Sequence, residues 1–307
     1  MTEFIDPLGT TQAVAEAYRR YLATFFQPAD SQLAAQLASQ LEHSYKLTKG
    51  PILQARAPYV EGASLRGLVE SAVLHPRLLE VDAEALPSDR PLYLHQEKAI
   101  CKVVAGRNVA IATGTGSGKT EAFIVPIVNS LLLEADRGTL GEPGVRALLL
   151  YPMNALANDQ MKRLQSFLSN FPDITFGRYV GDTQDNRQAA LEVYRRRFRR
   201  DPLPNELIDR RSMQEAPPHI LLTNYAMLEY LLLRPEDSRF FDGDTGRHWR
   251  YVVLDEVHVY DGAKGSELAM LLRRVRDRVN GSERGKLTCI ATSATLGTAG
   301  PGRRRVM

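Results

Sequence analysis

A glycine-rich segment about a third of the way along the chain carries the residue types that hold a phosphate group. It reads Thr113-Gly114-Thr115-Gly116-Ser117-Gly118-Lys119-Thr120. Glycines allow backbone amides to turn toward phosphate oxygens, and the N-terminus of a following helix adds partial positive charge at the same point. Lys119 is expected to reach the outer phosphates, and the Thr120 hydroxyl is expected to ligate the Mg²⁺ that neutralises them. The segment therefore predicts a site for a nucleoside triphosphate.

The surroundings of this loop match what phosphate binding requires, with one departure. An apolar strand over residues 109–112 precedes the loop and a helical run begins at Glu121, which is the strand, loop and helix order of a P-loop. The first glycine of the strict pattern is replaced by Thr113, at the least demanding position of the set. Pro126 lies inside the following helix and should kink it or loosen one hydrogen bond. Because an isolated glycine loop can be a simple turn, the assignment needs a second site.

A pair of carboxylates supplies that second site. The run Asp255-Glu256-Val257-His258 directly follows the apolar segment 251–254. Asp255 is expected to hold the metal through its water shell, and Glu256 to orient and deprotonate the water that attacks the γ-phosphate. His258 is grouped with them as a residue better placed to sense than to catalyse. A lone acidic pair at a strand end is more often solvated or caps a helix, but a glycine loop in the same chain favours the catalytic interpretation.

These groups can meet only if they leave the same edge of one sheet. Short apolar runs alternate with amphipathic helical patterns beyond residue 87, which predicts a parallel sheet with helices on both faces. The expected strands cover residues 109–112, 147–151, 175–180, 220–223, 251–254 and 287–291. Two covering helices are expected over residues 153–171 and 268–279, the second ending at Gly281. In such a sheet the ligand crevice lies beyond the carboxyl ends of the strands.

The first part of the chain has a different, mainly helical pattern. Apolar residues recur at helical spacing over residues 11–26 and 33–45, which predicts two amphipathic helices. An irregular segment follows Lys49-Gly50-Pro51, and a third helix is expected over residues 64–73. We therefore predict the following organisation: a helical N-terminal accessory region over 1–86, a nucleotide-binding domain over 87–298, and a tail or truncated linker over 299–307.

Composition is that of an ordinary soluble globular protein. Of 307 residues, 44% are hydrophobic and 24% are charged, a balance that excludes the disordered and fibrous classes. The net charge of +3 permits a nucleic-acid partner without requiring one. Cys101 and Cys289 are the only cysteines, which argues against a disulfide framework or a cysteine-based metal site. Without a targeting signal or an apolar run of membrane-spanning length, a cytoplasmic location with no membrane partner is expected.

With both sites in order, the chain resembles superfamily 2 helicases, especially the large bacterial DExH enzymes related to MrfA, over residues 90–295. The resemblance implies a RecA-like P-loop NTPase domain with ATP and Mg²⁺ as cofactors. Residues 91–96 are similar to the family's adenine-reading segment, in which Gln96 pairs with the adenine edge. Ser293-Ala294-Thr295 resembles motif III, which couples the nucleotide site to strand movement. The order of the motifs, each beside an expected strand, argues against coincidence.

Three further segments resemble motifs of this family's nucleic-acid side. Residues 151–160 resemble motif Ia and residues 223–228 resemble motif Ib, both of which touch the nucleic-acid backbone, and residues 178–183 are similar to a further strand-end loop. The implied contacts are at Pro152, Asn154, Ala155, Gly181, Thr223 and Asn224. The Asp-Glu-Val-His variant groups the chain with translocating DExH enzymes, so DNA is the expected substrate by analogy alone. Related enzymes serve DNA repair or defence against phage.

Several other polar and aromatic residues have ordinary structural interpretations. The stretch 194–200 reads Tyr-Arg-Arg-Arg-Phe-Arg-Arg and could track phosphates and stack on bases, but an exposed helical face is the preferred interpretation. Tyr225, Tyr230 and Trp249 could also stack on bases, although aromatic residues beside strands are usually core. The histidines without metal-ligand spacing are assigned to packing or to the surface, and these are His43, His219 and His248.

The residues after motif III are expected to be a linker or a truncated end and not a second RecA-like domain. Helicases of this kind hydrolyse ATP between two such domains, and the second supplies an arginine finger worth about 10³ to 10⁵ in rate. We therefore expect the ATP-binding half of an ATP-dependent DNA helicase, which needs a second RecA-like domain in cis or in trans for full activity. The alternative is a truncated, non-catalytic module that binds nucleotide or nucleic acid and regulates a partner. Gln96 and the 293–295 motif argue against a P-loop kinase or transport ATPase.

Overall fold

The computed structural model of the chain describes residues 6–43, 47, 58–114, 116–152, 154–280 and 287–294, with the side chains of residues 43, 154–159 and 280 excepted. The chain divides into two compact units, Met1–Pro58 and Tyr59–Met307. Within the described ranges, no helix combines the length and the apolar character that a bilayer span requires.

Two helices form the described part of the first unit, α1 (Pro7–Phe25) and α2 (Ser31–His43). α1 begins where the Asp6 carboxylate accepts a hydrogen bond from the amide of Leu8 at 3.0 Å. Pro7 suits the first helical position because the N–H that it lacks would have no partner within the helix. Both predicted amphipathic helices are present, and α1 starts four residues before the predicted start at residue 11.

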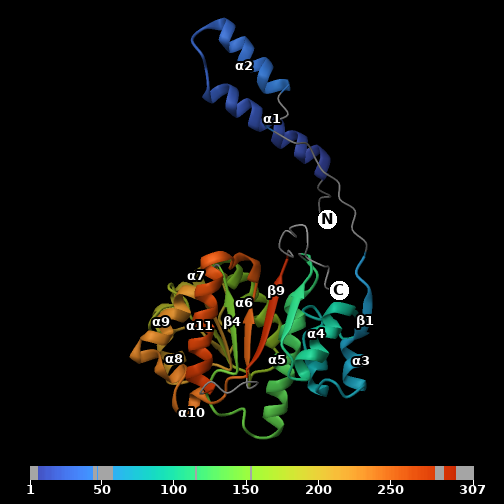
Figure 1. The fold of residues 1–307 in the computed structure, drawn as a ribbon, viewed down its shortest axis with the longest axis vertical. Coiled ribbons are helices and arrows are strands. Elements are labelled where there is room, and N and C mark those ends of the chain that lie inside the picture. Colours follow the sequence, from blue (N-terminus) through green and yellow to red (C-terminus); the bar gives the residue numbers. More distant parts are fainter. Residues whose placement is uncertain are drawn as a thin grey trace. The chain divides into compact units, whose positions relative to one another are not determined.

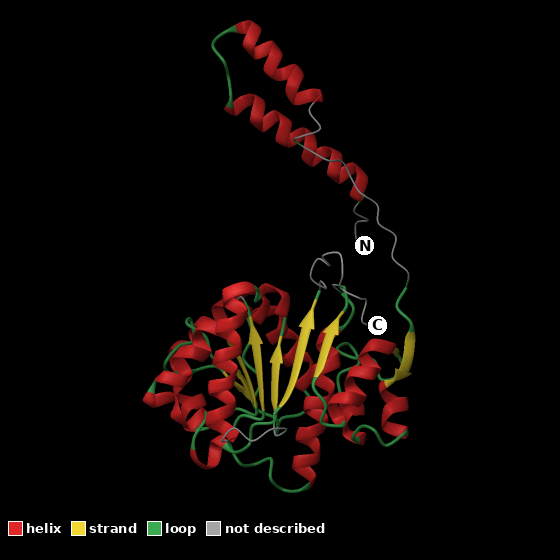
Figure 2. Cartoon of the chain, viewed as in Figure 1, coloured by secondary structure: helices red, strands yellow, loops and turns green. Residues whose placement is uncertain are grey.

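A parallel sheet of seven strands is the centre of the second unit, and Figures 1 and 2 show its arrows pointing to one edge. The strand order is β3-β9-β8-β4-β7-β5-β6. The strands are β3 (Val109–Ala112), β4 (Ala147–Tyr151), β5 (Phe176–Arg178), β6 (Glu206–Leu207), β7 (Ile220–Asn224), β8 (Tyr251–Leu254) and β9 (Thr288–Ser293). The six predicted strands are confirmed within two residues at each end, whereas β6 is too short to show a periodic pattern.

Helices flank the sheet on both sides (Figure 1). They are α4 (Leu94–Val104), α5 (Lys119–Asp136), α6 (Asn154–Leu168), α7 (Arg187–Phe198), α8 (Arg210–Glu215), α9 (Tyr225–Leu233), α10 (Gly243–Gly246) and α11 (Gly262–Asn280), with the 3₁₀ turns η1 (Pro76–Glu80), η2 (Pro235–Phe240) and η3 (Val257–Val259). α5 continues through Pro126 to its full length. The predicted fold class, a parallel α/β sheet covered on both faces, is therefore confirmed.

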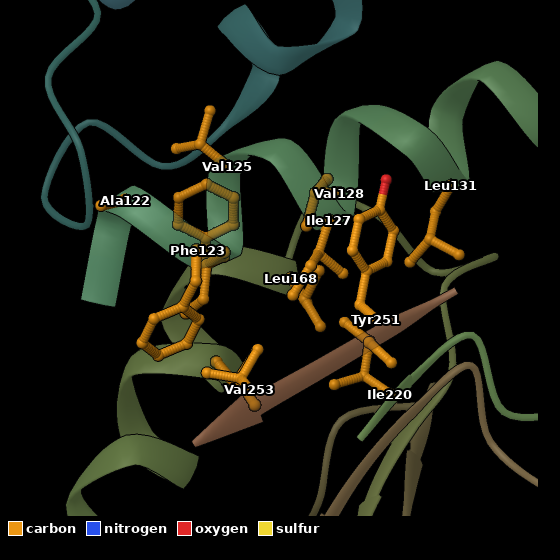
Figure 3. Close-up of a cluster of buried hydrophobic side chains, with 14 of the residues drawn as sticks. Ala122, Phe123, Val125, Ile127, Val128, Leu131, Leu168, Ile220, Tyr251 and Val253 are labelled. Atoms are coloured by element: carbon orange, nitrogen blue, oxygen red, sulfur yellow. The ribbon is translucent and has the colours of Figure 1, made fainter. Parts of the chain in front are cut away.

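The sheet separates two apolar layers, because alternate side chains of a strand point to opposite faces. In β4, residues 147, 149 and 151 belong to one buried cluster, while residues 148 and 150 belong to the other. The first cluster contains side chains of α4, α5 and α6, and the second contains side chains of α8, α9 and α11. Figure 3 shows part of the first cluster, with Phe123 of α5 and Val253 of β8 among its side chains. Burial on both faces explains why these strands read as continuous apolar runs.

Residues 59–86 belong to the compact unit that contains the sheet. A small antiparallel pair, β1 (Glu61–Ser64) and β2 (Pro91–Tyr93), leads into α3 (Leu65–Glu70). Leu65, Leu68 and Leu78 are buried in the same cluster as the apolar side of α5. The unit therefore begins at Tyr59 and not near Pro87, and the helical pattern over 1–86 does not form one region.

A buried arginine fastens the loop after α5 to the start of β4. Arg146 is 1% exposed, and its Nε lies 3.0 Å from Oε2 of Glu134. Its remaining N–H groups donate to the carbonyl oxygens of Glu142, Gly144 and Thr139 at 2.6 to 3.2 Å. Burial and this guanidinium together lower the pKa of the nearby His219 to about 4. His219 is therefore a buried, neutral side chain, and of its two predicted places, packing or the surface, it takes the first.

Replacing Arg146 by alanine should lower the free energy of unfolding by about 3 to 5 kcal/mol. The buried Glu134 carboxylate keeps only Arg250, whose Nε lies 3.3 Å from its Oε1, and three backbone carbonyls lose their donor. Arg77→Ala is the matched control, since Arg77 pairs with Glu80 at 3.3 Å on an exposed surface, where a pair contributes about 0 to 1 kcal/mol. Urea unfolding followed by circular dichroism measures both. Equal losses in the two variants would contradict the assignment of Arg146 as a structural centre.

Candidate functional site

The glycine loop lies between the end of β3 and the start of α5, at the carboxyl edge of the sheet. Gly116 and Gly118 have φ angles of 74° and 71°, in the left-handed region that favours glycine. A Cβ atom at Gly118 would lie 2.1 Å from Nε2 of Gln96, so a side chain at this position would have to displace the Gln96 amide. The Thr113 and Ser117 hydroxyl oxygens lie 2.7 Å apart and close the base of the loop. Thr115 lies outside the described residues.

Lys119 crosses from this loop toward the acidic pair. Its Nζ donates to the carbonyl oxygens of Thr113 at 3.1 Å and Gly114 at 3.2 Å. The same atom lies 4.0 Å from Oε1 of Glu256. The structure therefore brings the ammonium group and the acidic strand end to the two sides of one crevice.

The acidic pair is held by the neighbouring strand β9. The Thr292 hydroxyl donates to Oδ1 of Asp255 and accepts from the amide of Glu256 at 3.2 Å. Asp255 is 5% exposed, and burial, reinforced by the Glu256 carboxylate, raises its pKa above the ordinary value. A buried carboxylate whose charge is disfavoured in this way is stabilised by a cation, so the site suits a metal ion.

Glu256 is oriented by contacts on both sides. Its Oε2 accepts from the amide of Ala294 at 3.2 Å and lies 3.2 Å from Nδ1 of His258. The Ser293 hydroxyl is 3.3 Å from the same histidine nitrogen. The structure thus joins His258 and the first two residues of the predicted motif III to the acidic pair. Thr295, the third residue of that motif, lies outside the described residues.

Gln96 makes a positioning contact with the glycine loop. Its Oε1 accepts from the amide of Tyr93 at 2.7 Å, and its Nε2 donates to the carbonyl of Gly118 at 2.8 Å. His95 supports the same loop, since its Nε2 lies 2.9 Å from the Ser117 carbonyl oxygen. Gln96 is 3% exposed and lines the crevice with one N–H still available. Its role as the adenine reader stays a prediction.

These groups surround a cavity of about 410 Å³ at the edge of the sheet. Its lining consists of Glu61, Arg90, Pro91, Tyr93, Gln96, Gly116, Ser117, Gly118, Lys119, Thr120, Glu121, Gln160, Arg163, Asp255 and Glu256. Loop amides, one ammonium group, a threonine hydroxyl and two carboxylates form a donor set that fits a magnesium-bound triphosphate. Sequence reasoning missed Glu61, Arg90, Gln160 and Arg163, because no local pattern marks side chains that reach the cavity from other elements.

A second cavity of about 330 Å³ opens beside the ends of β4 and β7. Pro152 and Asn224, both predicted to contact nucleic acid, line it together with Tyr225, Ala226, Val259, Tyr260, Lys264 and Glu267. Tyr225 is half-buried, and its hydroxyl donates to Oε2 of Glu267 at 3.2 Å. The cavity therefore combines aromatic rings with a lysine, a composition suited to bases and phosphates.

Other predicted nucleic-acid contacts are distributed unevenly. Gly181 is exposed in the loop after β5. Thr223 is fully buried, and its hydroxyl donates to the Tyr179 carbonyl at 2.6 Å. The side chain of Thr223 is therefore part of the core, because it is fully buried and its hydroxyl is engaged by the Tyr179 carbonyl. The side chains of Asn154 and Ala155 lie outside the described residues.

The basic stretch forms the end of α7, as the preferred interpretation expects. Tyr194 points inward, where its hydroxyl donates to Oε2 of Glu206 at 3.0 Å. Arg196 and Arg197 are exposed, and Arg195 pairs with Asp201 at 2.6 Å.

The aromatic residues predicted either to stack on bases or to lie in the core differ in their exposure. Trp249 is core at 3% exposed, whereas Tyr230 is 53% exposed.

Comparison with known proteins places this geometry in a family. The model of the DEAD/DEAH box helicase family matches residues 93–300. The Druantia protein DruE of Escherichia coli is 27% identical over 96% of this chain and 21% of its own length. The ATP-dependent helicase Lhr-Core of Methanothermobacter thermautotrophicus is 33% identical over 66% of this chain and 21% of its own length.

A comparison of folds also finds helicases. Helicase MrfA, solved with DNA and AMPPNP, is 25% identical with a TM-score of 0.57, over 79% of this chain and 28% of that one. The expected RecA-like fold is therefore confirmed. The chain spans about a fifth of the length of each of these two curated relatives.

Gly118→Ala should destabilise the fold more than Gly106→Ala. Both glycines have φ near 70°, so both substitutions incur the left-handed penalty of about 1 to 2 kcal/mol. A Cβ at Gly106 meets nothing within 4 Å, whereas at Gly118 it displaces Gln96 and its hydrogen bonds, which adds about 1 to 2 kcal/mol. Urea unfolding of the two variants tests this. Identical losses would show that Gln96 does not fasten the loop.

Proposed function

Because the chain belongs to the DEAD/DEAH box helicase family, we propose that it is the ATP-binding half of an ATP-dependent DNA helicase or translocase. The observation that carries this proposal is the approach of Lys119 Nζ to Glu256 Oε1 at 4.0 Å across one cavity. It supports a site in which a phosphate-binding loop and a hydrolytic carboxylate act on the same nucleotide. Full activity is proposed to need a second RecA-like domain in cis or in trans.

Each residue of the nucleotide site has its own proposed role. The loop amides and Lys119 bind the phosphates, and Thr120 and Asp255 hold Mg²⁺, which neutralises phosphate charge when bound. Glu256 orients the attacking water and accepts its proton, since its carboxylate is fixed by the Ala294 amide at 3.2 Å. His258 contacts both Glu256 and Ser293, so it connects the acidic pair to the end of β9.

DNA is proposed as the nucleic-acid partner, bound over the ends of β4 and β7. The solved structures of MrfA with DNA, and of Mycobacterium smegmatis Lhr with single-stranded DNA at 26% identity and a TM-score of 0.50, support this choice. Within this chain, Pro152, Asn224 and Tyr225 gather around one cavity with Lys264. A lysine and partly exposed aromatic rings can bind a single strand through phosphate contacts and stacking.

Lys119→Ala should weaken binding of a non-hydrolysable ATP analogue by about 10- to 100-fold, the effect of losing a charged hydrogen-bond donor. The circular dichroism spectrum should be unchanged, because the ammonium group lies at the cavity wall and not in the apolar core. Lys102→Ala, on the exposed side of α4, is the control and should bind normally. Isothermal titration with Mg²⁺ present measures both, and unchanged affinity of Lys119→Ala would refute the site.

Glu256→Gln should leave binding of the analogue within about twofold and lower hydrolysis by about 10² to 10⁴, the range for loss of a general base. Single-turnover hydrolysis of labelled ATP, with a second RecA-like domain supplied in trans and single-stranded DNA present, measures such slow rates. Asp261→Asn makes the same chemical change at an exposed residue nearby and should hydrolyse ATP like the unaltered chain. A Glu256→Gln variant that hydrolyses ATP at the normal rate would remove Glu256 from the chemistry.

A further inference from the structure

Arg163 reaches the nucleotide cavity from α6 and contacts the residue proposed to ligate the metal. Its Nη1 donates to the Thr120 hydroxyl oxygen at 3.2 Å. The same hydroxyl donates its proton to Oε1 of Gln160, also at 3.2 Å. Thr120 is therefore engaged as a donor and as an acceptor by two side chains of one helix.

This arrangement opposes metal binding at Thr120. A Mg²⁺ ligand must direct an oxygen lone pair at the ion from about 2.1 Å. The guanidinium occupies only one of the two lone pairs of the hydroxyl as a hydrogen-bond donor, but its positive charge repels a second cation at this distance. Arg163 and Mg²⁺ therefore compete for the same oxygen.

A carboxylate next to Thr120 can receive the displaced guanidinium. Oε1 of Glu121 lies 4.0 Å from Nη1 of Arg163. Oε2 of Glu121 is buried and has no hydrogen-bond partner among the residues that the structure describes. A buried acceptor without a partner is costly, and a guanidinium can bind both carboxylate oxygens at once. Transfer of Arg163 from Thr120 to Glu121 would satisfy that acceptor.

The surroundings leave room for this movement. The side chain of Arg163 is 55% exposed, so it is not locked by packing. A further cavity of about 380 Å³ adjoins the nucleotide cavity, and the two share Thr120, Glu121 and Arg163 in their linings. Arg163 therefore lines both cavities, and Thr120 and Glu121 are its alternative hydrogen-bond partners.

We propose that Arg163 is a positioning residue that competes with Mg²⁺ for Thr120 and moves to Glu121 when the metal binds with the nucleotide. The inference rests on the proposed function and assigns to the site a preference for the metal-bound form of its nucleotide. Metal-free nucleotide leaves the contact between Arg163 and Thr120 in place. With metal-bound nucleotide, this contact would give way to two others. The Thr120 hydroxyl would ligate the metal, and Arg163 would pair with Glu121.

The test is a Mg²⁺ titration of the full chain with a fluorescent, non-hydrolysable ATP analogue. Arg163→Met should lower the Mg²⁺ concentration for half-maximal binding by about three- to tenfold, because the competing charged hydrogen bond on a half-exposed side chain is removed. Affinity measured in EDTA should stay within about twofold. Glu121→Gln should have the opposite effect and raise the required Mg²⁺, since the receiving carboxylate is weakened.

Lys102→Met is the control, because it removes the same charge from an exposed position of α4 that lines neither cavity, and it should leave the titration unchanged. Equal weakening of Arg163→Met with and without Mg²⁺ would show that the arginine binds phosphate, which contradicts the proposal. An unchanged Mg²⁺ requirement would contradict it as well while leaving the nucleotide site intact. If the unaltered chain binds no analogue at any Mg²⁺ concentration, the proposed function itself fails, and the inference fails with it.

Discussion

The contacts of the Thr292 hydroxyl fix the geometry on which the rest of the site depends. This one group donates to Asp255 and accepts from the amide of Glu256. It belongs to β9, which is inserted between β3 and β8 in the sheet. The Thr113 amide at the start of the glycine loop donates to the Ser293 carbonyl of the same strand at 3.2 Å. The phosphate loop and the acidic pair are therefore spaced by one shared strand.

The backbone at the acidic pair is strained, and its surroundings hold the strain. Glu256 has a φ of 49°, a left-handed conformation that costs a non-glycine residue about 1 to 3 kcal/mol. The contacts with Thr292 and Ala294 hold this residue on both its backbone and its side chain. The result is a carboxylate directed at Lys119 instead of one solvated at the strand end. Such strain is characteristic of residues whose orientation serves chemistry.

The strand order also places the two proposed binding regions at the ends of neighbouring strands. β4 lies between β8, which ends in the acidic pair, and β7, which ends at Asn224. α6 follows β4 directly, so the helix that starts beside Pro152 carries Gln160 and Arg163 to the Thr120 hydroxyl. The two regions therefore meet at β4, which leads through Pro152, a lining residue of the second cavity, into the helix that lines the nucleotide cavity.

The sequence by itself determined the local elements and the chemical identity of the site. Periodicity located the strands, and the order of strand, glycine loop and helix identified the phosphate site, because these signals lie within a few neighbouring residues. Only the tertiary structure decided which distant side chains meet. The burial of Thr223, the joining of residues 59–86 to the sheet unit and the contact of Arg163 with Thr120 all depend on strand order and side-chain packing. Those contacts join residues far apart in the chain, and no local pattern of residue types encodes them.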